Sequence, residues 1–243
     1  IDTMRLSRTI CLLAGLLCLL GGAARADDWS WELTKRQYKA LNPFERAQYV
    51  KARDLFRDGN YKAAASEFEK MKMQFPDSPI LPYAIFMHGR SLHEGKHRNK
   101  AIGVYNEVLD YFSNDVWVAA PALYYQGVAH FENGDDEKSL RAMKALVEDE
   151  DYVKQPVAAG ALRRLGDHFR EKGDWAKAVS YWKRAAEFHE SNSSEARNAR
   201  YSAVDYYIGS GEFASLLSWR VGPEGTEDDR RNAVLLAGGR ADE

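Results

Sequence analysis

Cysteine is scarce in this chain of 243 residues: only Cys11 and Cys18 are present, both within the first twenty positions. The rest of the chain therefore cannot build a disulfide framework or a thiolate metal site. An excess of charge of one sign is also lacking, since the formal net charge is −2, which gives no reason to expect a nucleic-acid partner. No phosphate-binding P-loop and no G-x-S-x-G nucleophile motif occurs, so we expect no cofactor.

Long apolar runs are missing as well. The most apolar stretch, residues 10–20, follows a short basic start and is shorter than the roughly 20 residues that a membrane span needs. Together with the Ala24-Arg25-Ala26 site, it is typical of a cleaved secretory signal peptide. We expect residues 1–26 to be removed, a periplasmic or secreted chain that begins at Asp27, and no stable membrane span thereafter. A retained membrane anchor is the alternative.

Five helix–turn–helix patterns fill most of the remaining chain. In each, a small residue is expected where the two helices approach most closely, and these residues recur at intervals of 37, 38, 39 and 38 positions: Ala52, Gly89, Gly127, Gly166 and Val204. A glycine follows at each turn, where a left-handed backbone can end the first helix: Gly59, Gly95, Gly134, Gly173 and Gly211. The sequence predicts an all-α fold. The alternative, a plain helical bundle, would not need one shared period.

The seven prolines agree with this frame. We expect none of them inside a helix, where proline costs about 3 kcal/mol. Each is assigned to a connector, a helix start or the tail: Pro43, Pro76, Pro79, Pro82, Pro121, Pro156 and Pro223.

The pattern resembles the tetratricopeptide (TPR) repeat. The resemblance implies a right-handed α-solenoid of about five helix–turn–helix repeats, near residues 45–78, 82–115, 120–153, 159–192 and 197–220. Flanking this repeat domain (45–220), we expect an N-terminal arm at 27–44 and an acidic linker with a C-terminal tail at 221–243. The long connectors and the phrase F-P-D-S-P at residues 75–79 look like the periplasmic TPR proteins of bacterial envelopes, namely the outer-membrane assembly lipoproteins and the coordinator of the Tol–Pal system.

In TPR arrays the first helices of the repeats line a concave groove, so the resemblance implies a partner-binding strip there. Its predicted members are Tyr49, Arg53, Arg57, Phe86, Arg90, Tyr124, Phe131, Arg163 and Arg170. Arginines would grip carboxylates and the rings would cover apolar side chains, which favours a protein or peptide segment of mixed acidic and aromatic character. The alternative is that these arginines only pair with nearby acids.

One motif is typical of a catalytic metal site. The stretch His93-Glu94-Gly95-Lys96-His97 matches H-E-x-x-H, which binds zinc only when one continuous helix carries both histidines. We expect the turn at Gly95 to break that helix, and we predict no catalytic residue and no metal site.

The functional interpretation is a secreted or periplasmic, non-catalytic TPR adaptor or scaffold that binds a protein of the bacterial cell envelope. One alternative is an accessory domain of a cell-wall enzyme. Another is a zinc metallopeptidase that uses the H-E-x-x-H motif. Should the strip not bind, the tryptophans Trp29, Trp31 and Trp117 are the next candidates.

Overall fold

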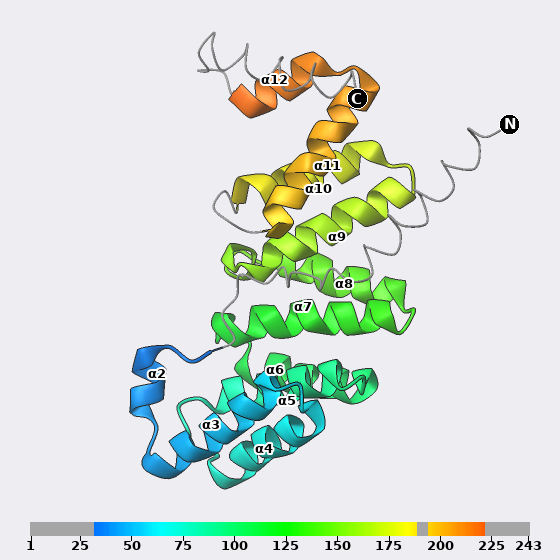
Figure 1. Cartoon of the computed structure of the whole chain (residues 1–243). Coiled ribbons are helices and arrows are strands. Elements are labelled where there is room, and N and C mark those ends of the chain that lie inside the picture. Colours follow the sequence, from blue (N-terminus) through cyan, green and yellow to red (C-terminus); the bar gives the residue numbers. More distant parts are fainter. Residues whose placement is uncertain (1–31, 189–193, 222–243) are drawn as a thin grey trace, which may run out of the picture.

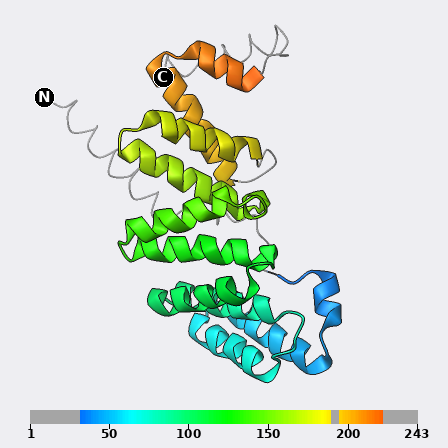
Figure 2. The ribbon, with the colours of Figure 1, turned by 180° about the vertical axis from the view of Figure 1, so that it is seen from behind.

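The computed structural model describes residues 32–188 and 194–221. The predicted signal peptide, the predicted tail beyond Val221, Trp29 and Trp31 lie outside these ranges. Within them the chain forms eleven α-helices and one short 3-10 helix, without a β-strand. The helices stack in sequence order along one axis (Figure 1), and the view from behind shows the same order (Figure 2). The all-α solenoid prediction is therefore confirmed.

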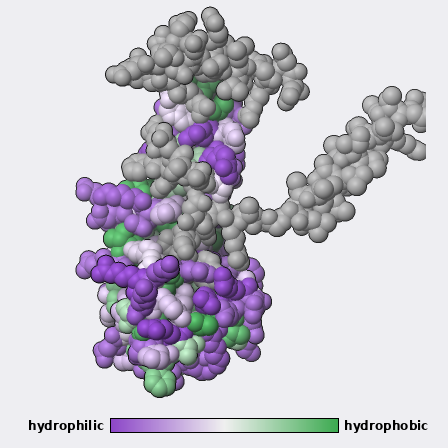
Figure 3. All heavy atoms as spheres, turned by 60° about the vertical axis from the view of Figure 1, so that its left-hand side comes forward, coloured by the Kyte–Doolittle hydropathy of each residue, from purple (hydrophilic) through white to green (hydrophobic). Residues whose placement is uncertain are grey.

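Five consecutive helix pairs make up the stack, and each helix packs on its neighbours in sequence. The pairs are α3 (Pro43–Arg57) with α4 (Tyr61–Gln74), α5 (Leu81–Glu94) with α6 (Arg98–Phe112), α7 (Val116–Glu132) with α8 (Asp136–Glu148), α9 (Val157–Glu171) with α10 (Trp175–Phe188), and α11 (Ser194–Ser210) with α12 (Phe213–Val221). The short helix α2 (Lys35–Ala40) precedes the first pair, and the 3-10 helix η1 (Tyr152–Lys154) joins the third pair to the fourth. On the face in Figure 3, hydrophilic and apolar side chains are interspersed over the described residues.

The start of α3 shows how local sequence sets a helix boundary. Asn42 is the N-cap, and its side chain accepts hydrogen bonds from the backbone N–H groups of Phe44 at 2.9 Å and Glu45 at 3.0 Å. The Glu45 carboxylate accepts in return from the Asn42 N–H at 2.7 Å, which completes a capping box. Pro43 occupies the first turn, where its missing N–H costs nothing.

Three of the small residues predicted at the helix crossings, the glycines, lie there. A Cβ atom added to Gly89 would be 2.7 Å from Tyr105 Cε1, and one added to Gly127 would be 2.7 Å from Met143 Cε. At Gly166 it would overlap the Trp182 ring. In the second, third and fourth pairs, therefore, the second helix packs directly on the backbone of the first at the predicted interval.

At one of the five turns the left-handed residue is not the predicted glycine. Gly59, Gly134, Gly173 and Gly211 have φ between 73° and 77°, whereas in the second pair Gly95 has φ −73° and Lys96 takes the left-handed conformation at φ 65°. The interval between small residues explains this. Each of the four left-handed glycines lies seven residues after the small residue of its repeat, and Lys96 stands in the same relation to Gly89.

Pro121 is the exception among the prolines, because it lies inside α7. The helix begins at Val116, before the predicted start, so the proline ring removes the hydrogen bond that the carbonyl of Trp117 would accept. Packing of the additional turn offsets this loss. Val118, Ala119 and Ala120 are fully buried, and Trp117 stacks on Tyr83 with ring centroids 5.5 Å apart at 15°. Trp117 therefore lies inside α7, ahead of the third repeat predicted at residues 120–153.

A run of rings crosses the first three helix pairs. Tyr38 of α2 meets Tyr49 of α3 at 6.0 Å, Tyr49 meets Tyr83 of α5 at 6.1 Å, and Tyr83 stacks on Trp117 of α7. We call these four rings the aromatic ladder. It links four helices from different parts of the chain by direct side-chain contact.

Candidate protein-binding surface

The aromatic members of the predicted strip are mostly buried. Tyr49, Phe86 and Tyr124 belong to the core, with Phe86 fully excluded from solvent. Phe86 therefore cannot cover a partner's side chain, and the strip is not an open groove at the second repeat. The physical reason is size: large rings at these positions fill the space between neighbouring repeats. Phe131 differs, because it is 56% exposed.

Most arginines of the strip have acidic partners within the chain. Arg53 pairs with Asp54 at 2.7 Å, and this hydrogen bond is the main cause that raises the pKa of Arg53. Arg57 pairs with Glu32 at 2.9 Å. In this structure these two arginines therefore form ion pairs with acids of the same chain, as the alternative interpretation predicts.

Arg90 and Arg163 are held more firmly. Arg90 is buried, pairs with Glu94 at 2.9 Å and lies 3.5 Å from the centre of the Tyr125 ring. Arg163 pairs with Asp167 at 2.7 Å and also with Glu195 of α11. Both side chains therefore tie elements of the fold together. Arg170, in contrast, is exposed on α9.

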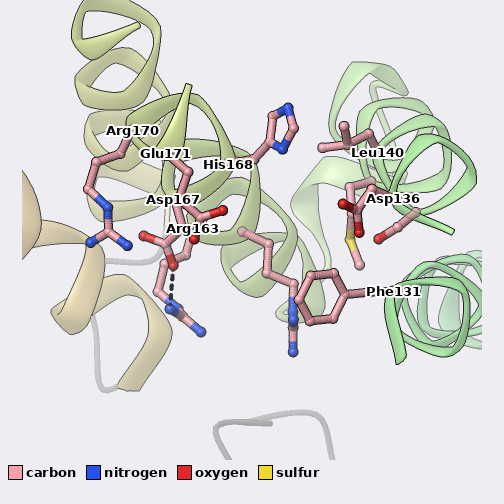
Figure 4. A pocket seen from close by; sticks show the side chains of 11 residues that line it. Phe131, Asp136, Leu140, Arg163, Asp167, His168, Arg170 and Glu171 are labelled. Carbon is pink, nitrogen blue, oxygen red and sulfur yellow. Dashed lines mark hydrogen bonds and ion pairs between the residues drawn. The ribbon is translucent and has the colours of Figure 1, made fainter. Parts of the chain in front are cut away.

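A cavity of about 260 Å³ lies between the third and fourth helix pairs. Its walls come from the end of α7, the first turns of α8 and the C-terminal half of α9. In Figure 4, Phe131 of α7 lies across the cavity from Arg163, Asp167 and Arg170 of α9, and a dashed line marks the Arg163–Asp167 pair. The cavity thus gathers Phe131, Arg163 and Arg170, three of the nine predicted strip residues, at one place.

Arg164 is a member of this cavity that the sequence interpretation missed. Its guanidinium carbon lies 6.0 Å from the centre of the Tyr124 ring and 5.9 Å from that of Phe131. Its Nε donates to the Tyr124 hydroxyl at 3.4 Å, and no carboxylate of the described residues forms an ion pair with it. Burial lowers the pKa of Arg164, but the Tyr124 oxygen and more distant acids offset this and raise it. A fixed cation therefore faces an exposed ring, and no described residue serves as its ion-pair partner.

The H-E-x-x-H motif does not form a zinc site geometry. α5 ends at Glu94, as predicted, so His97 lies beyond the helix as the N-cap of α6. His93 is buried, with Nε2 3.3 Å from a Glu132 carboxylate oxygen and Nδ1 3.4 Å from the Tyr105 hydroxyl. Burial lowers the pKa of His93 in spite of Glu132. The two histidines therefore do not share a helix face.

Two further properties concern the described ranges as a whole. No group of three or more His, Cys, Asp and Glu side chains in them is arranged to hold a metal ion. None of their helices is both long and apolar enough to cross a lipid bilayer.

Known families match the central part of the chain. Two tetratricopeptide-repeat models match residues 137–195 and 121–150. Two solved structures have a similar fold, the TPR-like repeats of a putative kinesin light chain from Podosopora anserina and a single-residue variant of it. The first has a TM-score of 0.51 at 11% identity and covers 84% of this chain and 98% of that one. The variant has a TM-score of 0.50 at 10% identity and covers 85% and 96%. No curated protein sequence matches the chain.

Proposed function

We propose that this chain, an all-helical array that carries tetratricopeptide repeats, is a scaffold that binds a segment of a partner protein at the cavity between its third and fourth helix pairs. TPR arrays typically mediate protein–protein interaction, and the cavity offers the chemistry for it. The observation that carries the proposal is the Arg164 guanidinium, which lies beside the exposed Phe131 ring without a carboxylate partner among the described residues.

The chemistry of the cavity defines the partner segment. A carboxylate beside Arg164 would form a charge-assisted hydrogen bond in a partly desolvated site, while an adjacent apolar side chain would cover Phe131 and exclude water. Arg170, exposed at the same cavity, attracts acidic segments in addition. The expected ligand is an acidic residue next to an aromatic or aliphatic one, presented by a peptide segment.

A random peptide library displayed on phage tests this chemistry. Selection on the full chain should enrich sequences with an acid next to an apolar residue. The selected peptides should bind Phe131→Ser and Arg164→Gln about ten-fold to a hundred-fold more weakly, as expected for loss of a charged hydrogen bond. Tyr111→Ser and Arg141→Gln are the matched controls, because both side chains are exposed on second helices of repeats, α6 and α8.

Two outcomes contradict the proposal. One is a selection that enriches no acidic–apolar sequence. The other is a set of peptides whose affinity falls equally in the variants and in the controls. Far-ultraviolet circular dichroism establishes that each variant keeps its helices, so that lost binding is not lost folding.

The cellular setting is a further part of the proposal. The basic start, the short apolar stretch 10–20 and the Ala24-Arg25-Ala26 site support export of the chain, which would place the scaffold in the periplasm or outside the cell. The partner would then be a protein of the cell envelope. Antibody detection in separated cell fractions tests this: a chain found only in the cytoplasm would contradict the export proposal and leave the binding proposal intact.

A further inference from the structure

The chain's own residues 32–41 cover the first-repeat end of the predicted strip. Glu32 pairs with Arg57 at 2.9 Å. The Leu33 N–H donates to the Tyr49 hydroxyl at 3.3 Å, and Leu33 also packs on the core. Tyr38 of α2 sets its ring edge against Tyr49 at 6.0 Å. Members of the strip thus contact a segment that comes before the repeats in sequence.

This segment runs antiparallel to α3. It begins beside Arg57 at the end of α3 and passes Tyr49 in its middle. It then reaches Arg46 near the start, whose guanidinium donates to the carbonyl of Lys39 at 3.1 Å and lies 5.8 Å from the Tyr38 ring centre. A bound partner segment would use the same path. The first helix of the array is therefore occupied over most of its length.

The contact between Glu32 and Arg57 is weak enough to be reversible. Arg57 and Glu32 are 51% and 41% exposed, and ion pairs that are this accessible to water contribute little to stability. Arg53 has an acidic neighbour of its own in Asp54, and Glu32 supplies a carboxylate that pairs with Arg57. An acidic residue of another chain could take its place at similar free energy.

We propose that residues 32–41 are an intramolecular occupant of the strip, which an extended acidic segment of a partner displaces. The inference deepens the proposed function and rests on it. The contacts of residues 32–41 also indicate which ligand the first-repeat end of the strip accepts: a carboxylate at Arg57 followed by an aliphatic side chain beside Tyr49. The sequence ahead of it, Asp27-Asp28-Trp29-Ser30-Trp31, has the acidic and aromatic character expected of such a ligand. Because an attached segment acts at a high effective concentration, it lowers the apparent affinity of any competitor.

A labelled peptide of residues 27–33, which includes Glu32 and Leu33, tests by fluorescence anisotropy whether the segment occupies the strip. The full chain should bind it weakly. The full chain with Glu32→Lys and Leu33→Ser, whose own segment is weakened, should bind it about ten-fold more tightly, because the binding-competent fraction rises. Adding Arg57→Glu to that variant should abolish the gain. Lys62→Glu, an equal charge reversal at an exposed site on α4, is the matched control and should leave the gain unchanged.

Equal affinity of the peptide for the wild-type and weakened chains overturns the inference, and so does a gain that survives Arg57→Glu. The substituted side chains are exposed or at the edge of the core, and circular dichroism verifies that the helices remain. Phe131→Ser should bind this peptide as the parent does, because the cavity lies two repeats away. Failure of the proposed binding at the cavity can thus be distinguished from failure of the proposed displacement at the first repeat.

Discussion

Adding a single methyl group to Gly166 should destabilise the array, while the same change at Gly103 should stabilise it. Both glycines lie in helices, where alanine is favoured by about 1 kcal/mol. At Gly103 nothing lies within 4 Å of the added Cβ, so that gain is kept. At Gly166 the Cβ would overlap the Trp182 ring and lie 3.1 Å from the carbonyl oxygen of Ala178.

Neither neighbour of Gly166 can yield easily. The Trp182 ring is 1% exposed and its Nε1 donates to Asp167 at 3.2 Å, while the Ala178 oxygen belongs to the backbone of α10. Overpacking of this kind costs about 1–3 kcal/mol, which exceeds the helix-propensity gain on average. We expect Gly166→Ala to lose about 1 kcal/mol net, and Gly166→Leu to lose more.

Thermal unfolding followed by far-ultraviolet circular dichroism measures both changes. For an array of this size, 1 kcal/mol corresponds to about 2–4 °C in Tm. Gly103→Ala should therefore raise Tm by about that amount, and Gly166→Ala should lower it by a similar amount or more. A Gly166→Ala chain as stable as Gly103→Ala would refute the close crossing of α9 and α10, and with it the frame that places small residues at one shared period.

Three other predictions follow from single sites. Lys96→Gly should raise the free energy of unfolding by about 0.5–1 kcal/mol, because glycine relieves a left-handed lysine; an unchanged Tm would contradict this. A hydrogen bond from Lys70, together with bonds from other nearby side chains, outweighs desolvation and lowers the pKa of Glu67 from 4.5 to about 2. The ionised Glu67 should therefore stabilise the fold above pH 4.5, and this contribution should be lost as the pH falls toward 2. Glu67→Gln should lack that part of the pH dependence of Tm. Finally, the intact mass of the exported protein should correspond to a chain that starts at Asp27, and a mass that includes the first 26 residues would exclude cleavage.

The helices and the repeat period could be predicted from the sequence, because close helix crossings require small residues at a regular interval and few other folds do. Gly89 and Gly127 are such positions, and Tyr105 and Met143 of the following helices pack on them. The same period locates the left-handed residue of the second turn at Lys96. The error at Gly95 came from giving glycine more weight than the spacing, although a non-glycine residue tolerates this conformation at a modest cost.

The candidate surface was less accessible from sequence. Position along a helix indicates the face on which a side chain lies, but not how closely the next repeat covers that face. Phe86 and Arg90 share the face predicted for them, yet the adjacent repeats bury both. Arg164 lies one residue from Arg163 and faces the preceding repeat, so no rule based on the first helix alone selects it. Pro121 shows a related limit, since tertiary packing of an additional turn outweighed its local cost.

The aromatic ladder provides an intrinsic spectroscopic probe of the first half of the molecule. In near-ultraviolet circular dichroism, rings give strong signals only when neighbouring groups hold them in fixed asymmetric positions. Tyr83 and Trp117 stack within 5.5 Å, and Tyr49 connects them to Tyr38 of the N-terminal segment. Movement of that segment should therefore alter the near-ultraviolet signal of Tyr83 in α5 and Trp117 in α7. Occupancy of the first repeat can be followed in the unlabelled protein, without a dye and before any partner is known.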